Sequence, residues 1–176
     1  MTVTLATGRS SRWRSVRPWI GLAARLGLAA VWLAAGGSKV GDLAGSGRAV
    51  NAYQVMPYDL AMVVGAALPL VEIALGVLLL VGLATRLAAG ISAALLVVFI
   101  AGIVSAWSRR LNIDCGCFGG GGELAAGQSP QYGTEILRDV GFLILAGILL
   151  TWPRTSLSID AWLAGGHLPE EKDEQS

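Results

Sequence analysis

Residues 60–83 read LAMVVGAALPLVEIALGVLLLVGL, an apolar run whose one charged residue is Glu72. A helix rises about 1.5 Å per residue, so about 20 apolar residues cross the hydrocarbon core of a bilayer. The run therefore predicts a membrane-spanning helix, and it decides the fold class before any motif is considered.

Three further apolar segments flank this run. Residues 20–37 and 87–107 have spanning length, whereas in residues 136–152 the uninterrupted apolar part begins only at Val140, a length also seen in buried or re-entrant segments. We count it as a span because Trp152-Pro153-Arg154 closes it like an interfacial anchor. The sequence thus predicts an all-α integral membrane protein, with a four-transmembrane-helix bundle over residues 19–153.

The composition agrees with a membrane protein. Of the 176 residues, 54% are hydrophobic and 14% are charged, whereas about 25% are charged in an average soluble domain. The formal net charge is +1, and the arginines stand at span ends rather than on one clustered face. A nucleic-acid partner needs such a clustered basic face, so we exclude one and expect a lipid bilayer as the main partner.

Charge also predicts the orientation. Residues 1–18 form a basic arm with four arginines, which the positive-inside rule places in the cytoplasm. Four spans then return the tail, residues 154–176, to the cytoplasm and leave the cysteine-bearing loop outside. The first span also resembles the apolar part of a signal peptide, but its length and the flanking Arg25 and Lys39 favour a retained helix. We predict a multi-pass protein of the cytoplasmic membrane.

Two helix faces collect residues that are unusual in a span. Residues spaced by three, four or seven lie on one helix face, and charged residues within a span normally turn inward. Since consecutive spans run antiparallel, Arg25 and Glu72 come to similar depth, and we predict a buried pair between them. Glu72 then either fixes helix packing or handles protons. The predicted inward residues are Arg25, Trp32, Gly36 and Lys39 on the first span, and Gly65, Pro69, Glu72 and Gly76 on the second.

The connector of residues 38–59 is glycine-rich in its first half. It is either a plain loop or a short helix on the membrane plane that ends at Pro57, because the residue before a proline disfavours helix.

Both cysteines of the chain stand one residue apart, as Cys115-Gly116-Cys117, just beyond the third span. A glycine permits the backbone of so small a ring, and a strained, exposed disulfide is readily reduced. So short a loop adds little stability, which argues against a structural disulfide. We predict Cys115 and Cys117 as catalytic thiols. Half of a soft-metal site, a palmitoylation site and an incidental pair remain alternatives.

Several charged residues are expected to support the thiols. Arg109, Arg110 and Arg138 are close in sequence or in the bundle, and nearby cations stabilise thiolates. Asp139 follows Arg138 in the first turns of the fourth span, where the helix N-terminus favours a carboxylate. We predict no metal site, since the single histidine, His167, has no neighbouring ligand.

Three stretches together carry a family resemblance. Residues 25–39 read RLGLAAVWLAAGGSK, residues 69–76 read PLVEIALG, and residues 115–119 read CGCFG. Over residues 19–152 this combination resembles the MauE/DoxX-like redox-associated membrane proteins, and CGCFG resembles the MauE branch. The resemblance implies a four-helix membrane protein. It also implies a role like that of MauE of methylamine-utilisation operons, which is thought to help mature the disulfide-rich methylamine dehydrogenase.

The predicted function is accordingly a membrane-embedded thiol–disulfide redox or maturation protein, acting on a thioredoxin-like or disulfide-containing substrate protein. One alternative is a non-enzymatic assembly or scaffold subunit of a membrane redox complex. Another is a DoxX-like electron-transfer subunit that uses a quinone. The resemblance to the vitamin K epoxide reductase type is incomplete, because the chain lacks an in-membrane Cys-x-x-Cys pair. About 13 residues of helix separate Glu72 from the outer surface, so we expect the carboxylate and the dithiol to be separate sites.

Overall fold

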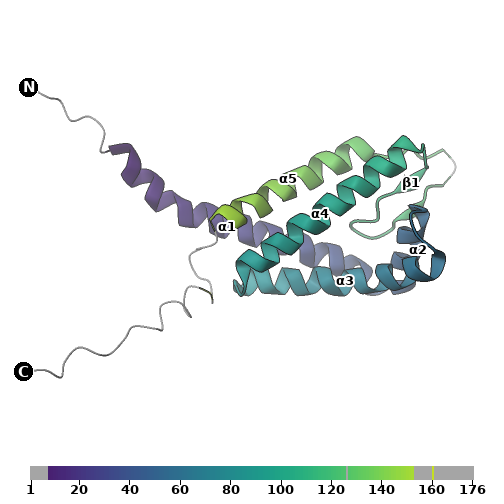
Figure 1. Ribbon diagram of the computed structural model, residues 1–176, viewed down its shortest axis with the longest axis horizontal. Coiled ribbons are helices and arrows are strands. Elements are labelled where there is room, and N and C mark those ends of the chain that lie inside the picture. Colours follow the sequence, from purple (N-terminus) through teal and green to yellow (C-terminus); the bar gives the residue numbers. More distant parts are fainter. Residues whose placement is uncertain (1–7, 126, 153–159, 161–176) are drawn as a thin grey trace, which may run out of the picture.

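The computed structural model describes residues 8–125, 127–152 and 160 (Figure 1). The long helices lie side by side, and α2 and the strands gather at the end opposite the α3–α4 turn. His167, the tail except Asp160, and the first residues of the basic arm lie outside the described residues. In this part of the chain the elements are α1 (Gly8–Lys39), α2 (Leu43–Ala52), α3 (Tyr58–Val81), α4 (Thr85–Ser108), β1 (Ile113–Asp114), β2 (Gly122–Glu123) and α5 (Tyr132–Thr151).

Three of the described helices are long and apolar enough to cross a membrane: Pro18–Lys39, Tyr58–Val81 and Thr85–Ser108. The predicted all-α membrane class is confirmed, and the first three predicted spans fall on these helices. The 20-residue α5 is less apolar, because Glu135, Arg138 and Asp139 occupy its first two turns. It nevertheless packs along α4 and α1 as part of the same bundle (Figure 1).

Small residues bring α1 and α3 into close contact. A Cβ atom on Gly36 would lie 2.7 Å from the Pro69 carbonyl oxygen, and one on Gly76 would lie 3.0 Å from the Leu33 backbone nitrogen. Only glycine permits this approach of two backbones. The two inward faces predicted for these helices are confirmed, since all of their members are buried: Arg25, Trp32, Gly36 and Lys39, and Gly65, Pro69, Glu72 and Gly76.

The predicted pairing of Arg25 with Glu72 is wrong. Glu72 Oε1 instead accepts a hydrogen bond from Lys39 Nζ at 2.6 Å. The contacts of Gly36 with Pro69 set an antiparallel register that brings the end of α1 level with Glu72. Arg25 lies 14 residues earlier in α1, about 21 Å along the helix axis. It interacts electrostatically with Asp160 at the opposite end of the bundle.

The connector between the first two spans contains a helix. The Asp42 side chain caps α2 by accepting the Gly45 N–H at 2.7 Å, and the helix ends at Ala52, well before Pro57. A Cβ atom on Gly65 of α3 would lie 2.5 Å from the Gly47 Cα. This contact between glycines holds α2 tightly against the end of α3, beneath the cysteine loop.

The segment after α4 forms a small antiparallel hairpin that the sequence did not predict. Ile113 pairs with Glu123, and Asp114 pairs with Gly122. Strands this short give no alternating pattern to detect. The hairpin is anchored by the buried Ile113 and by Tyr132, whose hydroxyl donates to the Leu111 carbonyl. The cysteines follow β1 directly and therefore sit on a supported loop.

Candidate functional site

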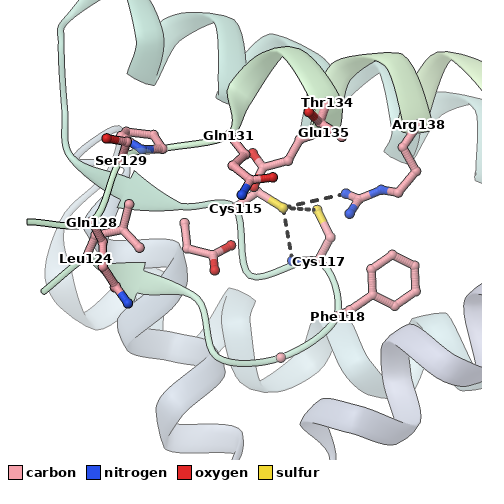
Figure 2. Close-up of a pocket in the computed structure, with 13 residues that line it drawn as sticks. Cys115, Cys117, Phe118, Leu124, Gln128, Ser129, Gln131, Thr134, Glu135 and Arg138 are labelled. Atoms are coloured by element: carbon pink, nitrogen blue, oxygen red, sulfur yellow. Dashed lines mark hydrogen bonds between the residues drawn. The ribbon is translucent and has the colours of Figure 1, made fainter.

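The two cysteine sulfurs face each other at the rim of a cavity (Figure 2). Cys115 Sγ and Cys117 Sγ lie 2.8 Å apart as free thiols. A disulfide bond is about 2.05 Å long, so only a small movement is needed to close it. The Cys117 backbone N–H also points at Cys115 Sγ, at 3.3 Å.

The backbone of the loop is shaped for this contact. Gly116 has a φ of +67°, and a Cβ atom on it would lie 2.9 Å from the Gly121 Cα, so both its conformation and its surroundings require glycine. Asp114 Oδ1 accepts the Gly116 N–H at 3.2 Å, and the Tyr53 hydroxyl donates to the Cys115 carbonyl at 3.1 Å. The loop is therefore held from β1 and from the end of α2.

The surroundings make the two thiols chemically unequal. Hydrogen bonds from the Cys117 thiol and backbone and from Arg138 lower the pKa of Cys115 below that of an ordinary thiol. Donation to Cys115, together with burial, raises the pKa of Cys117. The Cys117 backbone N–H and Arg138 both point at Cys115 Sγ, so Cys115 is the sulfur better placed to carry a thiolate, the nucleophilic form of a cysteine.

Arg138 is the cation that stabilises this thiolate. Its Nη2 hydrogen-bonds Cys115 Sγ at 3.6 Å, the contact drawn as a dashed line between these residues in Figure 2. Its guanidinium is held by the buried Asp139 at 3.1 Å and stacks on the Phe118 ring at 4.9 Å. The structure thus brings Arg138 and Asp139 to the thiols together, Asp139 acting through Arg138.

Arg109 and Arg110 are placed elsewhere. Arg109 donates to the backbone carbonyls of Tyr53 and Gln54 and so fastens α4 to the end of α2. Arg110 is exposed, with a left-handed φ of 55° at the end of α4. Of the three predicted cations, Arg138 alone hydrogen-bonds a cysteine sulfur within the described residues.

The sequence reasoning missed Glu135. Its carboxylate lies within 4.8 Å of Cys115 Sγ and of Asp114, and burial together with the nearby Asp114 raises the pKa of Glu135. Its position three residues before Arg138, and therefore on the same helix face, is the signal that could have found it. Tyr53 was also missed, and no local pattern marks it, because its contact with the loop spans 62 residues of sequence.

Asp114, Cys115 and Glu135 each bring a potential metal-ligand atom within 4.8 Å of the others. Cys117 would be the natural fourth ligand. Two sulfurs bound to one zinc at about 2.3 Å each would lie roughly 3.8 Å apart in tetrahedral geometry. The observed separation of 2.8 Å lies between that value and the length of a disulfide bond, about 2.05 Å.

The dithiol separates two cavities of opposite character. The outer one has a volume of about 610 Å³ and is lined mainly by polar residues of the loop and of α5, including Gln128, Gln131 and Glu135 (Figure 2). The inner one has a volume of about 230 Å³ and lies among α2, α3 and α4, with mostly apolar walls. Lys39 lines the inner cavity together with both cysteines. Lys39, the partner of Glu72, therefore borders the same space as the dithiol, whereas Glu72 is not among the residues that line it.

Comparison with known proteins identifies the family to which this chain is similar. The model of the family described as methylamine utilisation protein MauE matches residues 17–152. The methylamine utilization protein MauE of Paracoccus denitrificans is 36% identical over 107 residues, which cover 60% of this chain and 58% of that protein. The match thus spans less than two thirds of the relative's length. No solved structure matches the chain significantly.

Proposed function

This chain belongs to the methylamine utilisation protein MauE family, and from that premise we propose that it is a membrane-embedded thiol–disulfide exchange protein working through Cys115 and Cys117. The family is associated with methylamine utilisation. The observation that carries the proposal is the contact of the two sulfurs, 2.8 Å apart at the rim of an open polar cavity.

The exchange proceeds through a mixed disulfide on Cys115. The Cys115 thiolate attacks a partner disulfide, the partner's S–S bond breaks, and the departing partner sulfur takes up a proton. Cys117 then loses its proton and attacks Cys115 Sγ, which closes the Cys115–Cys117 bond and releases the second partner thiol. Run in reverse, the same steps transfer the disulfide to the partner. Glu135 is placed to accept and return the proton of Cys115.

The partner is a disulfide-containing or thioredoxin-like protein. The outer cavity is large enough for a loop rather than a whole domain, and its lining offers amide and hydroxyl groups from Gln128, Ser129, Gln131 and Thr134. Such groups hydrogen-bond the backbone of an extended segment. A polypeptide loop with an exposed cysteine therefore fits this cavity, and we place protein maturation, rather than small-molecule turnover, at this site.

The topology we propose has four spans, with α5 as the fourth. Both termini lie in the cytoplasm and the cysteine loop lies outside. The charges of α5 support this, because they stand in its first two turns, beside the loop, and Arg138 and Asp139 neutralise each other. The four arginines of the basic arm, which precede the candidate span Pro18–Lys39 within α1, support the same orientation. Disulfides turn over on that outer side of the membrane.

Thiol trapping in cells that carry the full chain tests this function. A membrane-impermeant maleimide should label the cysteines from outside after reduction, and native membranes should contain both dithiol and disulfide forms. Cys117→Ser should accumulate a mixed disulfide that dithiothreitol releases, because nothing resolves Cys115. Cys115→Ser, the matched control, should accumulate less of it, because burial still raises the pKa of the remaining Cys117 thiol.

Two outcomes would contradict the proposal. One is a cysteine pair that stays reduced under all growth conditions. The other is a stoichiometric partner that the Cys115→Ser, Cys117→Ser double variant still binds and fully supports. That second outcome would establish the assembly role in place of redox exchange.

A further inference from the structure

Exchange with a water-soluble partner uses the outer cavity and gives the inner cavity no role. We propose that the inner cavity binds the ring of a membrane-dissolved quinone, which accepts the two electrons of the Cys115–Cys117 dithiol. This inference rests on the proposed thiol–disulfide function and names the oxidant that regenerates the disulfide. The observation behind it is that Cys115, Gly116 and Cys117 line the outer end of this apolar cavity.

The inner cavity is reachable from lipid. Val64 of α3 and Val98 of α4 line it, and their side chains are 37% and 63% exposed on helices that qualify as membrane spans. Val64 and Gly102 each lie six residues from the outer ends of their helices, about 9 Å along the axis. The cavity therefore lies within the outer half of a hydrocarbon core about 30 Å thick. A molecule dissolved in the bilayer can enter without passing through water.

The volume and the apolar lining of the inner cavity suit the ring of a quinone. Its 230 Å³ is below the roughly 300–1,000 Å³ that holds drug-sized ligands. One substituted ring fits, and a long apolar tail would remain in the lipid. Leu68, Leu95, Phe99 and Met56 supply apolar parts of the cavity lining.

Lys39 gives the cavity one polar anchor. It is the charged member of the described lining residues, its side chain is 7% exposed, and Glu72 holds its ammonium at 2.6 Å. The ammonium can donate to a quinone carbonyl and stabilise the negative charge that develops there on reduction. Lys39 also lines a polar cavity of about 180 Å³ with Ser38 and Asp42, so protons can reach it from water.

The reaction balances with these groups alone. One S–S bond forms between Cys115 and Cys117, and the two thiol protons are released. The quinone takes up two electrons and two protons and becomes a quinol. A lipid chain would also fill an apolar cavity, but it would use neither the cysteines nor the buried ammonium, so the quinone accounts for more of the lining.

The test uses the full-length protein in detergent, reduced and kept anaerobic, with decylubiquinone as the probe. We expect one disulfide to form for each quinol produced. Val98→Trp should fill the mouth of the cavity and slow this reaction about tenfold, a loss of about 1.4 kcal/mol of transition-state stabilisation. Val97→Trp is the control, because Val97 is a neighbouring residue, 52% exposed, outside the cavity lining.

A second measurement separates this inference from the function on which it rests. All three proteins should react equally with a water-soluble aromatic disulfide, which enters by the outer cavity. If the wild type exchanges with that disulfide but decylubiquinone oxidises nothing, or if the two tryptophan variants behave alike, the quinone site is refuted and the exchange function stands. If the soluble disulfide does not react either, the proposed function itself fails.

Discussion

Cys115 and Cys117 line both the outer and the inner cavity, and the other residues that line the two cavities differ. On the outer side, Cys115 meets Arg138, Glu135 and amide side chains, whereas on the inner side it meets aliphatic and aromatic walls with Lys39 as the one cation. The loop of Asp114 to Gly119 is the partition. A thiol pair held in such a partition can exchange with a partner in water and with one in lipid, without a large conformational change.

The two sides also differ in what their charges do. Lys39 and Glu72 are both buried, so each depends on the other, whereas Arg138 is partly exposed and hydrogen-bonds Cys115 Sγ. Breaking the first pair should therefore affect folding, and changing Arg138 should affect chemistry. Variants of each pair separate these roles.

The largest effect should come from Lys39→Met, which leaves the Glu72 carboxylate buried without its cation. Removing one partner of a buried ion pair typically costs about 3–5 kcal/mol, so the purified protein should unfold at a clearly lower temperature in detergent. The Lys39→Met, Glu72→Met double variant should recover most of this stability because no lone charge remains. Equal melting temperatures for the single variant and the wild type would mean that the pair is not structural.

Gly116→Ala should have the next largest effect, because it adds a side chain inside the loop of Asp114 to Gly119 that separates the two cavities. The new Cβ atom would stand 2.9 Å from the Gly121 Cα and 3.2 Å from the Ala49 Cβ. Left-handed strain costs about 1–2 kcal/mol, and overpacking adds about 1–3 kcal/mol. The unfolding temperature should fall, and the rates of reaction with the soluble disulfide and with the quinone should both fall.

Gly120→Ala is the matched control for this variant. Gly120 has a similar φ of +71° but nothing within 4 Å of its added Cβ. It should show the conformational strain alone and leave both rates unchanged. If the two alanine variants lose the same stability, then close packing of the cysteine loop against Ala49 of α2 does not contribute to the position of the loop.

The smallest effect should come from Arg138→Gln, which acts on the outer side. Loss of the guanidinium removes a hydrogen bond that lowers the pKa of Cys115. A higher pKa means less thiolate at neutral pH, and a rise of one pKa unit reduces it about tenfold. The rate of Cys115 alkylation should fall, and its pH profile should move toward higher pH. Arg110→Gln removes an exposed arginine away from the sulfurs and should leave the profile in place.

Much of this protein follows from its sequence. The apolar runs determine the first three spans, because a bilayer leaves a helix as the only way to satisfy the backbone of an isolated spanning segment. The spacing of Gly65, Pro69, Glu72 and Gly76 determines which face turns inward. Cys115 and Cys117 are close in space because they are close in the chain.

The tertiary structure decided everything that depends on register between distant elements. Glu72 pairs with Lys39 instead of Arg25 because glycine contacts set how α1 slides along α3, and the sequence of either helix alone does not determine this register, which sets the depth of each cation relative to Glu72. Tyr53 reaches the cysteine loop only because the Gly47–Gly65 contact seats α2 beneath it. The existence of an apolar cavity behind the dithiol likewise arises from the packing of three helices, since a cavity is a property of their separation and no local pattern encodes it.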